Sequence, residues 1–162
     1  MKIAFIQTGG TIDKDYPHQI KGWAFDIGDP AFIRILNHAH HQHEISCHEV
    51  LKKDSLEITD LDRSELKNFI TRLTEKSIII THGSDTLLET AEALSEIKNK
   101  TILITAAMLP EKFKDSDAAF NLGMAVAGAQ HLKPGVYIAI HGYLRDWRDF
   151  ERDMGSGQYF LR

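Results

Sequence analysis

The chain has almost no cysteine and no segment that resembles a membrane span. Cys47 is its only cysteine, so no disulfide can form within the chain, and a reducing compartment is expected. No apolar run approaches the roughly 20 residues that a membrane-spanning helix needs. The first residues run directly into a strand pattern and lack the apolar core and cleavage site of a signal peptide. The sequence therefore predicts a cytoplasmic protein without a membrane partner.

Runs of basic residues are missing as well. The net charge is −4, and no stripe of lysine and arginine could follow a phosphate backbone. Nucleic acid is therefore not an expected partner, whereas small ligands remain possible. The apolar fraction of 43% and the charged fraction of 26% are ordinary for a globular protein. A chain of 162 residues can bury a sizeable core as one unit, so a single domain over residues 1–162 is predicted.

Short apolar segments alternate with helical patterns along the chain. Asp29 and Pro30 are expected as the N-cap and the first residue of a helix, and Thr59 and Asp62 have capping-box spacing. A long loop is expected over residues 12–28. Strands are predicted at 2–7, 44–51, 77–81, 100–106 and 135–140, and helices at 29–40, about 59–73, 84–97 and 117–129.

This alternation decides the fold class. Continuously apolar strands separated by helices are typical of a parallel sheet that is covered on both faces. Since crossovers between parallel strands are right-handed, the helices divide between the two faces. The sequence therefore predicts an α/β fold, a three-layer doubly wound and mainly parallel sheet of flavodoxin-like or Rossmann-like type.

Polar clusters follow the first three predicted strands. They are TGGT at residues 8–11, Asp54 with Ser55, and THGSDT at residues 81–86. Because ligands of such sheets bind beyond the carboxyl ends of the strands, these clusters are expected to meet around one site.

Each cluster also has a purely structural interpretation. TGGT lacks the spacing of nucleotide-binding motifs, so its glycines serve either a close approach to a ligand or an ordinary turn with capping hydroxyls. Ser84 and Asp85 suit a helix N-cap, and they also suit a hydroxyl and a carboxylate presented to a substrate ammonium. The histidines of residues 38–43 are typical of a solvated face, so no metal is predicted. Cys47 is expected to be a packed thiol within a strand.

Taken together, these clusters resemble the bacterial-type L-asparaginase family. TGGTI at residues 8–12 is similar to the first asparaginase signature, and THGSDT at residues 81–86 is similar to the second. Residues 53–55 resemble the family's substrate-clamping serine segment, and residues 107–110 and 115–122 resemble the stretch that follows its fourth strand. The resemblance covers nearly the whole chain in order, and it is to the N-terminal domain alone, as in a short, single-domain branch.

The resemblance implies an amidohydrolase that converts L-asparagine and water into L-aspartate and ammonia without a cofactor. Thr11 would attack the side-chain amide carbon and form an acyl-enzyme that water then cleaves. Tyr16 would assist Thr11. Ser84 stands where the family has a second threonine, and backbone N–H groups near Gly10 and Ser84 would stabilise the oxyanion.

The remaining site residues are implied in the same way. Ser55 would bind the substrate α-carboxylate, Asp85 would bind the α-ammonium, and the backbone at Ala107 would lie against the reacting amide. Arg152 stands where the family has a catalytic lysine. An arginine cannot release its proton at accessible pH, although it still supplies fixed positive charge.

Alternatives to a working asparaginase remain at this stage. One is a catalytically weak or inactive relative that binds aspartate or asparagine, for which Arg152 is the main evidence. Others are hydrolysis of a different amide and a nucleotide-binding protein of flavodoxin type. The resemblance also implies a homodimer or a higher homo-oligomer, because sites in the family are completed by neighbouring subunits.

Overall fold

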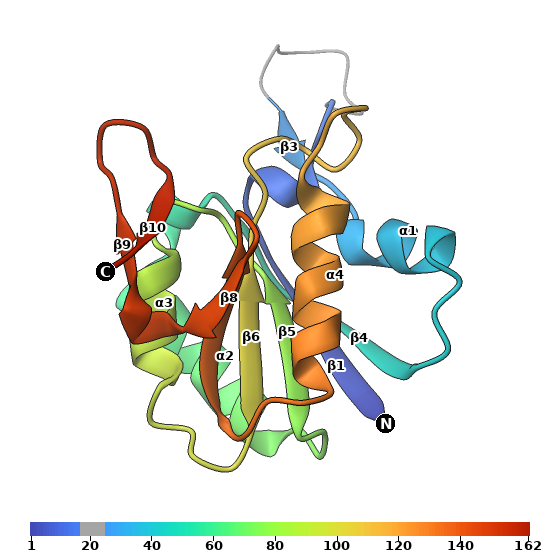
Figure 1. Cartoon of the computed structure of the whole chain (residues 1–162), viewed down its shortest axis with the longest axis vertical. Helices are drawn as coiled ribbons and strands as arrows, with labels where there is room; N and C mark the ends of the chain where they lie inside the picture. The colour runs from blue at the N-terminus through green and yellow to red at the C-terminus, as the bar shows by residue number, and fades with distance from the viewer. Residues whose placement is uncertain (17–24) are drawn as a thin grey trace.

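A computed structural model describes residues 1–16 and 25–162, and its centre is one six-stranded sheet (Figure 1). The strand order is β4-β1-β5-β6-β7-β8. The first five of these strands are parallel, and β8 pairs antiparallel with β7. The strands are β1 (Lys2–Gly9), β4 (Glu44–Lys53), β5 (Ser77–Thr81), β6 (Thr101–Thr105), β7 (Gly135–Ile140) and β8 (Tyr143–Asp146).

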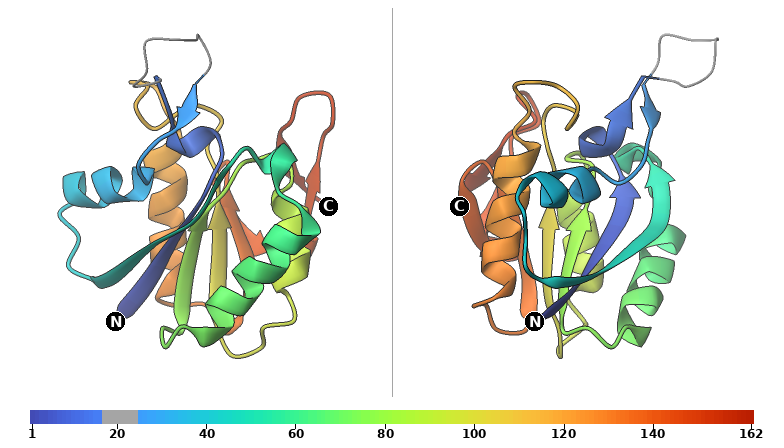
Figure 2. Two further views of the ribbon diagram at one scale, coloured as in Figure 1. Left: turned by 180° about the vertical axis from the view of Figure 1, so that it is seen from behind. Right: turned by 90° about the vertical axis from the view of Figure 1, so that its right-hand side faces the viewer.

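Helices cover both faces of the sheet (Figure 2). Helices α1 (Ala31–His38) and α4 (Ala118–Ala129) pack with one apolar cluster, and α2 (Asp60–Arg72) and α3 (Leu87–Leu94) pack with the other. In β5, Ile78 and Ile80 enter one cluster and Ile79 enters the other, which explains why this strand is apolar throughout. The three-layer α/β fold predicted from the sequence is thereby confirmed.

Several short elements lie outside the predicted pattern. The expected loop over residues 12–28 contains the 3₁₀ turn η1 (Thr11–Asp13) and a small ladder of β2 (Lys14–Asp15) with β3 (Asp26–Ile27), while residues 17–24 lie outside the described part. Three further strands were not predicted, because each has only three or four residues and gives no clear periodicity. They are β8, β9 (Phe150–Arg152) and β10 (Tyr159–Leu161). Strands β9 and β10 form a hairpin, and η3 (Trp147–Asp149) joins this hairpin to β8.

The helix starts differ from prediction at two of three positions. The capping box of α2 is confirmed, with Asp62 N donating to Thr59 Oγ1 over 3.2 Å and Thr59 N donating to Asp62 over 2.8 Å. For α1, Pro30 rather than Asp29 is the N-cap, and the carboxylate of Asp13 accepts the Ala31 N–H. The expectation was wrong because a side chain 18 residues upstream caps this helix.

The predicted cap of α3 was also wrong. This helix starts at Leu87, and its N-cap is Thr86 rather than Ser84. Residues 84–86 stay outside the helix because Asp85 N and Thr86 Oγ1 both donate hydrogen bonds to Ser55, on a neighbouring loop. The structural interpretation of Ser84 as a cap is therefore excluded.

Strand β4 forms one edge of the sheet, and its side chains are half-buried or exposed. Cys47 is exposed there, so its prediction as a packed thiol was wrong, because the helices do not fully cover this edge strand. Among the helices of the described residues, none has the length and apolar character needed to cross a membrane.

Candidate active site

The three polar clusters lie at the point where the strand order reverses. The chain leaves β1 for α1 and β4 on one side, and it leaves β5 for α3 and β6 on the other. In doubly wound folds, ligands usually bind at this point, outside the carboxyl ends of the two strands where the order reverses, which here are β1 and β5. In Figure 1 these ends point to the top of the sheet.

Three loops approach each other closely there. Gly10 has a φ of +87° and donates its N–H to the Lys53 carbonyl over 3.0 Å. A β-carbon on Gly10 would lie 2.3 Å from Cα of Gly83, and a β-carbon on Gly83 would lie 2.5 Å from Oγ of Ser55. Only glycine fits at both positions, and their contact brings the residues that follow them, Thr11 and Ser84, to the same edge of the sheet.

Ser55 joins the second loop to the third. It begins the 3₁₀ turn η2 (Ser55–Glu57), and it is 1% exposed. Its Oγ accepts the N–H of Asp85 over 3.3 Å, and its carbonyl accepts the hydroxyl of Thr86 over 2.7 Å. The oxygen of Ser55 that was expected to bind a substrate therefore also shapes the turn that carries Asp85.

The C-terminal hairpin adds a cation to this turn. Arg152 Nη2 lies 2.5 Å from Asp85 Oδ1, and the two side chains are 16% and 37% exposed. The hydroxyl of Tyr159 donates to the carbonyl of Ser84. Burial raises the pKa of Tyr159 above its ordinary value, so this hydroxyl remains a donor at neutral pH. Asp85 is therefore held between Ser55 on one side and the hairpin on the other.

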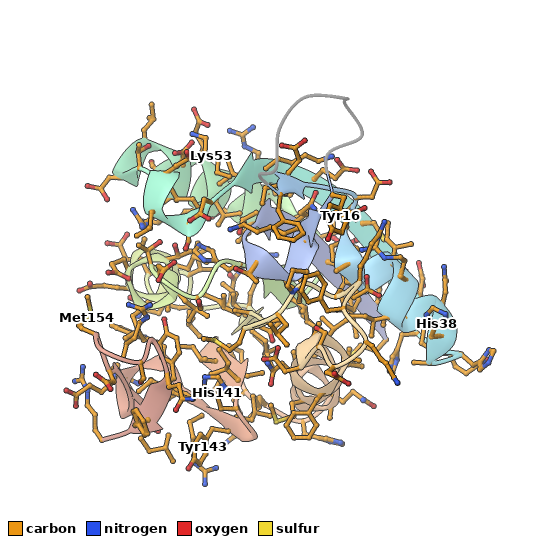
Figure 3. All side chains as sticks on the ribbon, turned by 90° about the horizontal axis from the view of Figure 1, so that it is seen from above. Tyr16, His38, Lys53, His141, Tyr143 and Met154 are labelled. Atoms are coloured by element: carbon orange, nitrogen blue, oxygen red, sulfur yellow. The ribbon has the colours of Figure 1, made fainter. Side chains whose placement is uncertain are left out.

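Thr11 and Tyr16 differ in how they are placed. Thr11 starts η1 and is half-buried, and within residues 1–16 and 25–162 no hydrogen bond engages the hydroxyl of Thr11 or Ser84. Tyr16 is 70% exposed, and its ring centroid lies 5.2 Å from that of Phe25. Figure 3 shows Tyr16 beside the N-terminal elements, well apart from Met154 on the hairpin. The structure brings Thr11 to the site and leaves Tyr16 at its periphery.

Ala107 lies beyond the end of β6, next to β5, and is completely buried. Asn121 of α4 donates its side-chain amide to the preceding carbonyl, that of Ala106, over 3.0 Å. The side-chain oxygen of Asn121, Oδ1, accepts the N–H of His141 over 3.2 Å. Asn121 thus fixes the loop ends after β6 and β7, and nothing in the spacing of the sequence singles it out.

A buried chain of hydrogen bonds supports the third loop from below. His82 is fully buried, with Nδ1 2.8 Å from the Gly83 carbonyl and Nε2 2.8 Å from Thr90 Oγ1. Arg63 Nε donates to Thr90 Oγ1 over 3.2 Å. Since arginine only donates and a carbonyl only accepts, the chain has one direction, with His82 protonated at Nδ1 and accepting at Nε2.

Burial determines the charge of His82. Burial lowers the pKa of His82 to about 4, and the nearby positive charge of Arg63 acts in the same direction. His82 is therefore neutral at pH 7. Its unprotonated nitrogen, Nε2, already accepts the Thr90 hydroxyl, and Nδ1 donates to Gly83, so His82 acts as a support of the loop rather than as a base.

Comparison with known proteins identifies the family of this chain. The family model described as "Asparaginase, N-terminal" matches residues 2–151. The chain belongs to the asparaginase family. It is 34% identical over 147 residues to the L-asparaginase of Thermococcus kodakarensis, a match that covers 86% of this chain and 44% of that protein. It is 38% identical over 73 residues to a component of the glutamyl-tRNA(Gln) amidotransferase of Methanococcus vannielii, a match that covers 44% of this chain and 17% of that component.

Solved asparaginase structures share the fold. The thermostable L-asparaginase from Thermococcus kodakarensis superposes with a TM-score of 0.84 at 27% identity, covering 99% of this chain and 51% of that one. A probable cytoplasmic L-asparaginase from Campylobacter jejuni gives a TM-score of 0.79 at 27% identity, covering 93% and 49%. This asparaginase-family chain spans about half the length of these relatives and corresponds to their N-terminal domain.

A cavity of about 630 Å³ lies between α1 and α4, and its lining does not include Thr11, Ser55, Ser84 or Asp85. His38, His41 and His43 of the predicted solvated face line it, together with Glu111 and Phe113. In the part of the chain that the structure describes, no group of three or more His, Cys, Asp or Glu side chains is arranged to hold a metal ion.

Proposed function

We propose that this asparaginase-family chain hydrolyses an amino acid amide, with L-asparagine as substrate and L-aspartate and ammonia as products. The proposal rests mainly on one observation: Thr11, Ser55, Ser84 and Asp85, which come from three separate loops, gather where β1 and β5 end. Two hydroxyls that make no hydrogen bond within the described residues stand there beside a carboxylate, an arrangement that suits a small zwitterionic amide.

The proposed reaction has two steps. Thr11 Oγ1 attacks the side-chain amide carbon, the C–N bond breaks, and the nitrogen leaves as ammonia after taking up the hydroxyl proton. The resulting ester on Thr11 is then attacked by water, which releases aspartate and restores the hydroxyl. Tyr16 would have to move toward Thr11 in order to assist, since its ring packs against Phe25 in this structure.

The other site residues would bind and polarise the substrate. Ser55 would meet the α-carboxylate while its Oγ keeps the bond from Asp85 N, because a hydroxyl can donate and accept together. Asp85 would share its carboxylate between the α-ammonium and Arg152. Backbone N–H groups near Gly10 and Ser84, together with the loop at Ala107, would surround the reacting carbonyl.

Ammonia release tests the proposal. Purified protein with L-asparagine should release ammonia, Thr11→Ala should abolish the release, and Thr11→Ser should keep part of it. Thr71→Ala, which changes an exposed threonine on α2, serves as the control. If Thr11→Ala released ammonia at an unchanged rate, the role of Thr11 would be refuted.

A second function is favoured by the ion pair of Asp85 with Arg152. A guanidinium does not release its proton, so this pair gives fixed charge but no proton shuttle. The alternative is a protein that binds aspartate or asparagine without turnover, which calorimetry would detect as heat of binding without ammonia. Arg152→Lys separates the two functions: a large gain in turnover indicates a decayed site, whereas an unchanged rate indicates a working one.

Two further expectations belong to this proposal. A cytoplasmic location agrees with the name of the Campylobacter jejuni neighbour. A homo-oligomer would bring neighbouring subunits to the site, and light scattering that finds only monomer at working concentration would contradict it.

A further inference from the structure

Asp13 ends the three-residue turn that Thr11 begins. It is 1% exposed, its N–H donates to the Gly10 carbonyl over 3.1 Å, and its own carbonyl accepts the N–H of Gly28 over 2.8 Å. The turn has no side-chain cap at its start. Its position is therefore fixed by the contacts of Asp13 together with those of Ile12, which is fully buried and whose carbonyl accepts the N–H of Glu111 over 3.1 Å.

The carboxylate of Asp13 reaches three other elements. Oδ1 accepts the N–H of Ala31 over 2.7 Å, at the start of α1, where the unpaired N–H groups of a helix favour an anion. Oδ2 accepts the hydroxyl of Thr81, the last residue of β5, over 3.4 Å, and the side-chain amide of Gln7 in β1 also donates to this carboxylate. One side chain thus connects the Thr11 turn to α1, β1 and β5.

We propose that Asp13 is a positioning residue that holds the Thr11 turn at the ends of β1 and β5, and that it does so only while its carboxyl is ionised. The part that concerns catalysis rests on the proposed role of Thr11. No step of the reaction uses Asp13 directly, because its carboxylate is engaged in the bonds described.

Ionisation matters because the bonds to Asp13 are stronger when their acceptor is charged. A protonated carboxyl loses this charge and turns one acceptor oxygen into a donor, so it holds Ala31, Thr81 and Gln7 less strongly than the carboxylate does. Protonation therefore weakens at least one of the links to α1, β1 or β5. The turn that carries Thr11 then loses part of what holds it.

Burial puts this change in an accessible pH range. Burial raises the pKa of Asp13 to about 6, although the hydrogen bonds from Ala31, Gln7 and Thr81 oppose that rise. From α1, Arg34 faces Asp13 with its positive charge, itself paired with Glu111 over 2.6 Å. From β4, Lys52 lies within electrostatic range, while β1 and β5 contribute only the neutral Gln7 and Thr81.

Nuclear magnetic resonance of the whole chain tests the linkage without any substrate. The amide of Ala31 and the methyl group of Thr11 should titrate together, with a midpoint near pH 6, and Asp13→Asn should abolish both titrations. Glu65→Gln, which changes an exposed carboxyl on α2, should leave them intact. Lack of a shared titration in the unmodified protein would overturn the proposal, and this readout does not depend on the variant folding.

Kinetics then test the consequence for Thr11. Between pH 7.5 and 5, kcat should fall roughly ten- to a hundredfold in the unmodified protein. Asp13→Asn should have the low kcat at both values, with KM little changed, because a neutral side chain imitates the protonated acid. A kcat of Asp13→Asn that equals the unmodified value at pH 7.5 would overturn the positioning role. Failure of the chain to hydrolyse asparagine at all would refute the proposed function, and the shared titration would still decide the role of Asp13.

Discussion

Gly10 and Gly83 touch through their backbones, so that a β-carbon on Gly10 would lie 2.3 Å from Cα of Gly83. This contact joins the loop after β1 to the loop after β5, which are 73 residues apart in the chain. The hydroxyl of Thr8, which donates to the Thr81 carbonyl over 2.8 Å, is a second link between the two asparaginase signatures. The site depends on this absence of side chains as much as on the hydroxyls that follow.

Gly10→Ala should therefore strongly destabilise the protein. The new methyl group meets backbone that cannot move aside, and the φ of +87° is unfavourable for alanine, so a loss of about 3 kcal/mol or more is expected. Urea unfolding would measure it. Gly123→Ala is the matched control, because a β-carbon there meets nothing within 4 Å and alanine favours the interior of α4. Equal stability of the two variants would contradict the steric argument.

Tyr159→Phe should weaken the attachment of the hairpin to the third loop. The variant loses the hydrogen bond to the Ser84 carbonyl and keeps the ring, so about 1 kcal/mol of unfolding free energy should be lost. Tyr143→Phe, at an exposed tyrosine on β8, should change stability by less than about 0.5 kcal/mol. Denaturant unfolding compares the two variants. An unchanged unfolding free energy in Tyr159→Phe would show that this bond does not hold the hairpin.

Thr90→Val should destabilise the protein, because it interrupts the buried hydrogen-bond chain beneath the site. The substitution preserves shape, but it leaves Arg63 Nε and His82 Nε2 without their shared partner, which should cost roughly 2–4 kcal/mol. Thr90→Ser keeps the hydroxyl and should retain most of the stability. Thermal unfolding can rank the three proteins. If valine were tolerated as well as serine, the hydroxyl would have no part in the chain.

A fall in pH should change the contributions of His82 and Asp13 to the free energy of unfolding in opposite directions. The pKa of His82 is about 4 in the folded protein against an ordinary 6.5, so its contribution to stability is lost as pH falls from about 6.5 toward 4. The pKa of Asp13 is raised from 3.8 to about 6, so the folded state gains stability as pH falls through about 6. Between pH 7 and 5 these changes amount to about 2 kcal/mol lost and about 1 kcal/mol gained.

Asp13→Asn isolates the histidine contribution. Unfolding free energies at pH 7 and pH 5 should differ by about 1 kcal/mol in the unmodified protein and by about 2 kcal/mol in the variant. Urea titrations at the two pH values provide the measurement. The same pH dependence in both proteins would show that Asp13 does not take up a proton in this range.

Much of the fold could be predicted from local pattern. The strands at 77–81 and 135–140 match β5 and β7, because buried parallel strands are apolar on both faces. The capping box at Thr59 and Asp62 was visible for the same reason, since both partners lie within one turn. Topology then placed the loops after β1, β4 and β5 together, because parallel strands end at one edge of the sheet.

The features that the sequence did not predict are those whose partners lie far apart. The cap of α1 comes from Asp13, and the direction of the Arg63, Thr90 and His82 chain depends on three separate elements. Tyr159 lies in a strand of three residues, too short for a periodic signal. The only local sign of Asp13 was an acidic residue directly after an apolar one, which is also common on exposed turns.

The docking of the β9–β10 hairpin has a kinetic consequence. Arg152 and Tyr159 reach across 67 and 75 residues to Asp85 and Ser84, whereas the Ser55 contact to Asp85 spans 30. Contacts between remote parts of a chain form late, since more of the polymer must be ordered before they can close. During refolding, secondary structure should therefore recover before the charge on Asp85 is balanced, and the contacts of Arg152 and Tyr159 with the third loop should form in the last phase.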